Sequence, residues 1–161
     1  MTVTSTATPP AFILGTWYLD EAYAVDDAGT RLFDLYGAKP DGLINYGADG
    51  RMVALITHDG RACIDGDRQA APAEQRAVAY GSSIGYAGPY TVDDERVIHH
   101  VDVSTYPNWV GTDLKRFYTR EGAGADESLT LRTPPQMQNG KITVMKLIWR
   151  RRRTRPPGVP A

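Results

Sequence analysis

The most constraining feature of this 161-residue sequence is a series of short segments with strand-like alternation, separated by turn residues at nearly even spacing. Gly and Pro, which occur 16 and 11 times, gather with Asn and Asp between many of these segments. Short strands at even spacing are typical of all-β sandwiches and barrels rather than of helical bundles. The segments with this pattern cover residues 12–21, 30–36, 43–46, 52–57, 86–92, 97–103, 114–120, 129–133 and 142–150.

One segment departs from this pattern. Pro72 can begin a helix, Glu74 falls in the first turn, and apolar residues follow at helical spacing, which predicts one short helix around residues 72–83. Because most of the strands are close enough in sequence to be joined by hairpins, we expect a single antiparallel up-and-down β-barrel of about eight to ten strands rather than a sandwich. A barrel of about eight strands can enclose one small ligand.

Length and composition fit one domain. Hydrophobic residues make up 42% of the chain and charged residues 23%, as in ordinary globular proteins, and a net charge of -1 gives no reason to expect nucleic acid as a partner. No apolar stretch is long enough to cross a membrane. We expect a disordered leader over residues 1–11, the barrel over 12–151 and a flexible Arg/Pro-rich tail over 152–161. A single cysteine and the absence of a signal-like segment favour a cytoplasmic location.

A histidine pair lies in the segment around residues 97–103. Alternation places His99 on the more apolar face, toward the barrel interior, and His100 among solvent-facing polar residues. An interior imidazole can act as a general acid or base, so His99 is the first catalytic candidate. The alternative is a structural histidine that bonds to a tyrosine or a backbone group. A register slip of one residue would exchange the roles of the two histidines.

The following strand offers a cation on an alternating face. Arg116 shares this face with Leu114 and Tyr118, so it can hold a carboxylate, enolate or phenolate of a ligand. An unpaired buried guanidinium would be costly. The alternative is therefore a structural ion pair, for which Glu21 and Asp34 are the candidate partners.

Aromatic residues supply candidate pocket walls. Tyr90 shares one strand face with Tyr86, and we include its hydroxyl among the catalytic candidates because it can stabilise developing negative charge. Aromatic rings in turns can cover a ligand at the barrel mouth, although core packing explains the same residues about as well. The candidate binding residues are Tyr46, Tyr86, Tyr106, Trp109 and Tyr118.

Other kinds of chemistry are not indicated. The three histidines lack a recognised metal-ligand spacing, so no metal is expected. The Gly-rich segments lack the context of a dinucleotide or phosphate loop, so no cofactor is expected. His58, which precedes an Asp-Gly turn, ranks below His99 as an acid or base.

The segment Gly15-Thr16-Trp17 resembles the Gly-x-Trp signature of lipocalin-type barrels. In those barrels the tryptophan closes one end, and an arginine of the final strand packs over it; Arg150 or Arg151 can fill that place here. The bacterial lipocalin-like domain family shows further similar segments in the same order. These are a segment like Tyr86-Ala-Gly-Pro-Tyr90, a histidine strand, a turn like Pro107-Asn-Trp-Val-Gly-Thr112 and an arginine strand.

This resemblance covers about residues 14–151 and implies a barrel that binds or transforms a hydrophobic small molecule. Our first hypothesis is a cofactor-free enzyme of secondary metabolism that cyclises, isomerises or dehydrates a hydrophobic oxygenated substrate. In it His99 moves a proton, and Arg116 with Tyr86 or Tyr90 stabilises an oxyanion. The alternative is a non-catalytic carrier of a hydrophobic metabolite. A third hypothesis is a protein-interaction module that uses the Arg-rich end, and a homodimer is left open.

Overall fold

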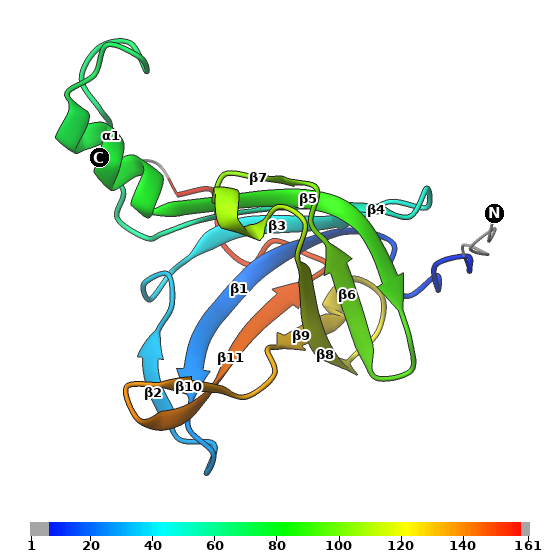
Figure 1. Cartoon of the computed structure of the whole chain (residues 1–161). Coiled ribbons are helices and arrows are strands. Elements are labelled where there is room, and N and C mark those ends of the chain that lie inside the picture. The colour runs from blue at the N-terminus through cyan, green and yellow to red at the C-terminus, as the bar shows by residue number, and fades with distance from the viewer. Residues whose placement is uncertain (1–6, 159–161) are drawn as a thin grey trace.

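The structure, a computed structural model, describes residues 7–158 and is drawn in Figure 1. Residues 1–6 of the predicted leader and 159–161 of the predicted tail lie outside the described residues. The elements are β1 (Gly15–Val25), β2 (Arg31–Asp34), β3 (Asp41–Tyr46), β4 (Arg51–Thr57), α1 (Ala73–Gly81), β5 (Ser83–Val92), β6 (Arg96–His100), β7 (Val103–Ser104), η1 (Pro107–Trp109), β8 (Asp113–Glu121), η2 (Gly124–Asp126), β9 (Ser128–Arg132), β10 (Gln136–Gln138) and β11 (Lys141–Arg150).

The strands form a closed antiparallel barrel. Neighbouring strands follow the order β1, β3, β4, β5, β6, β8, β9 and β11, and β11 then pairs with β1. The predicted antiparallel lipocalin-like barrel is therefore confirmed, with eight strands in the closed ring. Closure leaves the ring without a free edge, so every strand of it has two hydrogen-bonded neighbours.

The predicted strands agree with the observed ones to within a few residues, and the helix predicted at 72–83 is observed as α1. Two differences are informative. The short strand β10 was not predicted, and the segment predicted as one strand over 97–103 is divided into β6 and β7.

A β-bulge separates β6 from β7. Tyr90 of β5 pairs with His99, whereas Ala87 pairs with Val103, so β5 is opposed by one extra residue. Gly88 lies under the bulge, where a Cβ would come within 1.9 Å of the His100 carbonyl oxygen. Because the bulge reverses the alternation, Val103 is 62% exposed, although unbroken alternation from His99 would place it on the inner face.

One barrel end is closed by the first residues of the domain. Trp17 is fully buried and donates its indole N–H to the carbonyl of Ile13, with an N to O distance of 2.9 Å. The guanidinium carbon of Arg151 lies 3.6 Å from the centroid of a Trp17 ring. Arg151 also donates to the carbonyl oxygens of Leu14 and Phe12. Of the two arginines proposed for this place, Arg151 occupies it.

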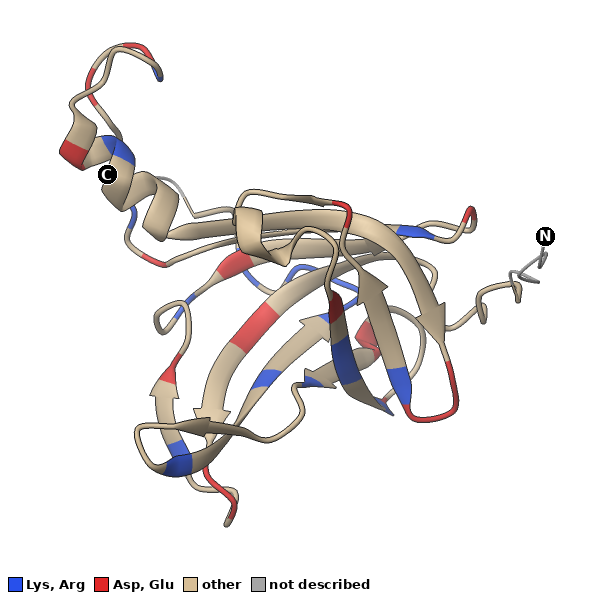
Figure 2. Cartoon of the chain, in the orientation of Figure 1, with Lys and Arg blue, Asp and Glu red and all other residues tan. Residues whose placement is uncertain are grey.

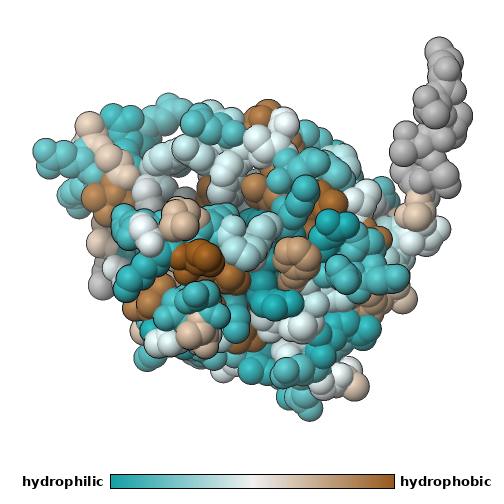
Figure 3. Space-filling view, turned by 60° about the horizontal axis from the view of Figure 1, so that its bottom comes forward, coloured by the Kyte–Doolittle hydropathy of each residue, from teal (hydrophilic) through white to brown (hydrophobic). Residues whose placement is uncertain are grey.

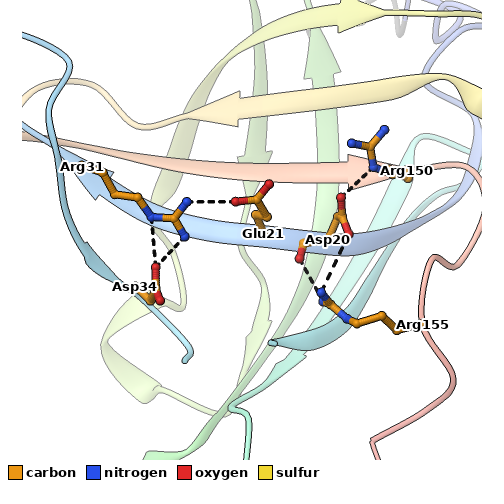
Figure 4. Close-up of polar contacts among 6 residues, drawn as sticks. All are labelled: Asp20, Glu21, Arg31, Asp34, Arg150 and Arg155. Carbon is orange, nitrogen blue, oxygen red and sulfur yellow. Dashed lines mark hydrogen bonds and ion pairs between the residues drawn. The ribbon is translucent and has the colours of Figure 1, made fainter. Parts of the chain in front are cut away.

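The adjacent arginine has another role. Arg150 donates to Asp20 with an N to O distance of 2.7 Å, and Arg155 also reaches Asp20 (Figure 4). Arg153 contacts Asp41. The described part of the Arg/Pro-rich segment therefore lies against β1 and the start of β3. Figure 2 shows that the two signs of charge are interspersed over the strands.

The helix α1 and the loop before it project from the barrel (Figure 1). No residue of α1 is buried, and Val78 and Tyr80 are exposed. Further exposed apolar side chains lie on two short strands outside the closed ring. They include Phe33 of β2, which pairs with β1, and Met137 of β10, which pairs with β11. Figure 3 shows apolar side chains among hydrophilic ones on that side. No helix among residues 7–158 is long and apolar enough to span a membrane.

We expect Arg151→Ala to lower the free energy of unfolding by about 2–4 kcal/mol. The substitution removes charge-assisted hydrogen bonds to two carbonyl oxygens and the cation–π contact with Trp17. Urea denaturation would measure the change. The control is Arg152→Ala at the exposed neighbouring position, which should change the stability by no more than about 0.5 kcal/mol. Equal effects of the two substitutions would contradict this role of Arg151.

Candidate functional site

The barrel end opposite Trp17 carries a hollow that we call the mouth. Its wall is formed by the start of β5, the end of α1, the loops after β2 and β4, and η1. It has a volume of about 250 Å³, close to the lower end of the roughly 300–1,000 Å³ typical of ligand pockets. The residues that line it are Tyr36, His58, Tyr80, Gly81, Ser83, Ile84, Thr105, Tyr106 and Trp109.

A chain of aromatic rings connects the mouth with the barrel interior. Trp109 contacts Tyr106 edge to face, with centroids 5.9 Å apart, and contacts Tyr86 in the same way at 5.4 Å. Tyr86 in turn lies 5.8 Å from the ring of His99, and Tyr46 lies 5.7 Å from His99 on the other side. The structure therefore brings together five of the residues predicted for the site.

His99 faces the interior, as predicted. Its side chain is fully buried, and both ring nitrogens have partners: Nε2 lies 2.8 Å from the Tyr46 hydroxyl, and Nδ1 lies 3.2 Å from the Tyr86 hydroxyl. His100 faces outward and contacts Asp113 and Thr91. The inner position results from the β5 and β6 register, in which His99 pairs with the buried Tyr90.

Burial determines the protonation of this group. Loss of solvent holds the pKa of His99 well below its ordinary value, and the positive charge of Arg116 lowers it further. Burial raises the pKa values of Tyr46 and Tyr86, so both hydroxyls keep their protons at neutral pH. A neutral imidazole has one donor and one acceptor nitrogen, so one tyrosine accepts a hydrogen bond from His99 and the other donates one.

Arg116 lies on the inner face of β8, opposite the fully buried Val97 of β6. Its Nη1 donates to the carbonyl of Lys115, with an N to O distance of 2.9 Å. The ion-pair partners considered for it are engaged elsewhere, because Glu21 and Asp34 both bind Arg31 (Figure 4). Arg116 forms no ion pair with any carboxylate of residues 7–158.

Two predicted site residues lie away from the nitrogens of His99. The Tyr90 hydroxyl donates to the Gly47 carbonyl at 2.8 Å, while its ring packs on Tyr46. The Tyr118 hydroxyl donates to the Asp93 carbonyl at 2.9 Å, and its ring packs on Phe12 at the closed end. Both hydroxyls are thus used in holding turns in place.

Seven of the nine residues that line the mouth were not predicted as binding residues, and three of them are informative. Ile84 lies two residues before Tyr86 on the same strand face, so extending the alternation backwards would have identified it. Tyr36 lies after β2, and its place depends on the loop that follows. His58, ranked low from the sequence, lines the mouth and packs against the Tyr36 ring with centroids 5.2 Å apart.

Two larger hollows are also present, and the first adjoins the mouth at His58. One, of about 500 Å³, lies between α1 and the loop around residues 58–64, and the other, of about 570 Å³, lies between residues 7–10 and the turn around Gly50. We favour the mouth because its Trp109 contacts Tyr86 of the barrel interior. Within the described part of the chain, no three His, Cys, Asp or Glu side chains are grouped so that they could hold a metal ion.

The buried His99 predicts a loss of stability in mild acid. The unfolded chain takes up a proton near pH 6.5 and the folded protein does not, so the free energy of unfolding falls as the pH is lowered from about 7 to about 5. His99→Gln should flatten this part of the curve, whereas the control His100→Gln should retain it. Urea denaturation at several pH values would measure both. An unchanged slope in His99→Gln would contradict a neutral buried imidazole.

Comparisons with known proteins agree with this architecture. A family model described as a lipocalin-like domain matches residues 14–152. A curated relative, the 4'-hydroxy-3'-methoxypropiophenone carrier protein ppsC of Aspergillus oryzae, is 37% identical over 67 residues. This match covers 37% of the chain and 56% of the relative, so the chain spans little more than half the length of the curated relative it matches. The barrel, the Trp17 and Arg151 closure and the family match together show that the chain belongs to the lipocalin-like domain family.

Proposed function

We propose that the protein is a carrier that binds one small hydrophobic, aromatic molecule at the mouth of the barrel. The observation that carries this proposal is the aromatic lining of the mouth, where Tyr36, Tyr106 and Trp109 surround a hollow of about 250 Å³. Aromatic walls with a few polar groups are typical of small-molecule sites. Tyr86 and Tyr46, which connect the mouth with His99, are proposed to support this wall from inside.

The partners of His99 favour binding over catalysis. Both of its ring nitrogens are bonded to tyrosine hydroxyls, and the ring is completely shielded from solvent. To exchange a proton with a substrate, the imidazole would have to break one of these bonds. The arrangement therefore supports a structural role for His99, in which it satisfies two buried hydroxyls.

The partial match to a carrier protein supports the same class of function. The molecule named in that relative is an aryl ketone with hydroxy and methoxy groups, which combines an aromatic ring with oxygen acceptors. A ligand of this kind suits a mouth with aromatic rings and the Thr105 and Tyr106 hydroxyls. A cytoplasmic location and a homodimer, both suggested by the sequence, stay predictions.

A second candidate function is the acid–base catalysis proposed from the sequence, in which a substrate is cyclised, isomerised or dehydrated. One observation favours it: the partly exposed His58 lines the mouth beside Tyr36, so it can reach a bound molecule directly. In this case His58 is the first candidate for proton transfer. His99, Arg116 and Tyr90 would then shape the interior and its charge.

We expect the neutral fluorescent probe N-phenyl-1-naphthylamine to bind saturably, and Trp109→Ala to weaken its binding about tenfold or more. The reason is that Trp109 is the mouth residue that contacts both Tyr106 and Tyr86. Fluorescence titration would give both dissociation constants. The matched control is Val110→Ala at the exposed adjacent position, which should bind as the wild type does. Absence of saturable binding, or equal binding by Trp109→Ala, would count against the proposal.

A carrier should return its ligand unchanged. We expect that incubation with a metabolite extract of the producing organism enriches a compound in the protein fraction without converting it. Liquid chromatography with mass spectrometry would compare active with heat-killed protein. An isomeric or dehydrated product made by active protein, and lost in His58→Gln or His99→Gln, would instead establish the enzymatic alternative.

A further inference from the structure

The barrel interior contains a positive charge that the protein itself does not neutralise. Arg116 pairs in register with Val97, and antiparallel partners project their side chains to the same face. Val97 is fully buried, and Leu114, two residues before Arg116, packs against the core. The Arg116 side chain therefore belongs to the inner face of β8.

The surroundings of Arg116 hold no compensating anion. The pKa values of the interior groups Tyr36, Tyr46, Tyr86 and His99 all respond to the charge of Arg116, and no carboxylate contributes to any of them. His99 is neutral at physiological pH and the tyrosines keep their protons. Arg116 is therefore a cation close to these groups, with no carboxylate partner among residues 7–158.

Part of the guanidinium remains available for a ligand. Nη1 donates to the Lys115 carbonyl, whereas Nε and Nη2 have no acceptor among residues 7–158. These two N–H groups lie side by side on the guanidinium and match the two oxygens of a carboxylate. Trp149 also has a free donor, because its buried indole N–H has no hydrogen-bond partner among residues 7–158.

We infer that the barrel selects an aromatic carboxylate, with the ring held by the aromatic wall of the mouth and the carboxylate paired with Arg116. This inference rests on the proposed binding function and specifies the ligand class. The strand register connects the two parts of the site. Leu114, the neighbour of Arg116 on the inner face of β8, pairs with His99, and Tyr86 contacts both His99 and Trp109 of the mouth. Arg116 is half-buried, and an ion pair at such a position is stronger than one on the open surface, so the charge favours an acid over a neutral ligand of the same shape.

The experiment compares 2-naphthoate with its uncharged amide, 2-naphthamide, as competitors of N-phenyl-1-naphthylamine. We expect the wild type to bind 2-naphthoate at least about tenfold more tightly than the amide. Added salt should weaken the binding of 2-naphthoate and leave the binding of the amide unchanged. Arg116→Gln should remove this preference, while Arg116→Lys should keep part of it. The matched control is Lys115→Gln, an exposed cation at the adjacent position, which should leave the preference unchanged.

The outcomes separate this inference from the proposed function. If N-phenyl-1-naphthylamine binds but the wild type treats acid and amide alike, the anion specificity is wrong and the carrier function stands. The same conclusion follows if Arg116→Gln keeps the preference for the acid. If none of the three compounds binds the wild type, both proposals fail. Circular dichroism and urea denaturation of Arg116→Gln, compared with the wild type, show whether the variant is folded.

Discussion

Pairing of the first strand with the last is the constraint on which the rest of the structure depends. Without the β1 and β11 ladder, the sheet would have two free edges and an inner face open to water. With it, the inner face becomes a shielded interior that contains Trp17, Trp149 and His99. The same pairing brings Arg151, which follows β11, over the tryptophan at the start of β1.

Charged groups are distributed unevenly in the barrel. At the closed end, Glu127 accepts from Arg120 and lies 3.5 Å from Arg151, so both arginines there have a carboxylate partner. Elsewhere in the interior, aromatic rings and protonated tyrosines surround a neutral His99, and Arg116 has no partner carboxylate within the described residues. Ion pairs are thus concentrated at the closed end, whereas the candidate site residues lie in the rest of the interior and at the mouth, an arrangement in which a rigid scaffold can accommodate a variable site.

Much of the fold follows from the sequence because alternation and turn residues are local signals. They predicted the barrel and the inward direction of His99 from the strand period, and the position of α1 from Pro72 and the helical spacing that follows it. The break after His100 could not be predicted, because the bulge depends on the contact of Gly88 with a neighbouring strand. The partners of Arg116 and Tyr90 could not be predicted either, because they depend on contacts between distant segments. Alternation within one strand does not show which carboxylate or carbonyl lies near a given side chain. For the same reason Tyr36 was missed.

The mouth has walls of unequal stiffness. The β5 side belongs to the closed ring, whose amides can exchange with solvent only when several strands separate together. By contrast, α1 has no buried residue and contributes Tyr80 and Gly81 to the same mouth. Its hydrogen bonds can open in a local fluctuation that leaves the barrel intact, so amide exchange should be much faster in α1 than in β5. A local movement of α1 can therefore widen the mouth without disturbing the closed end.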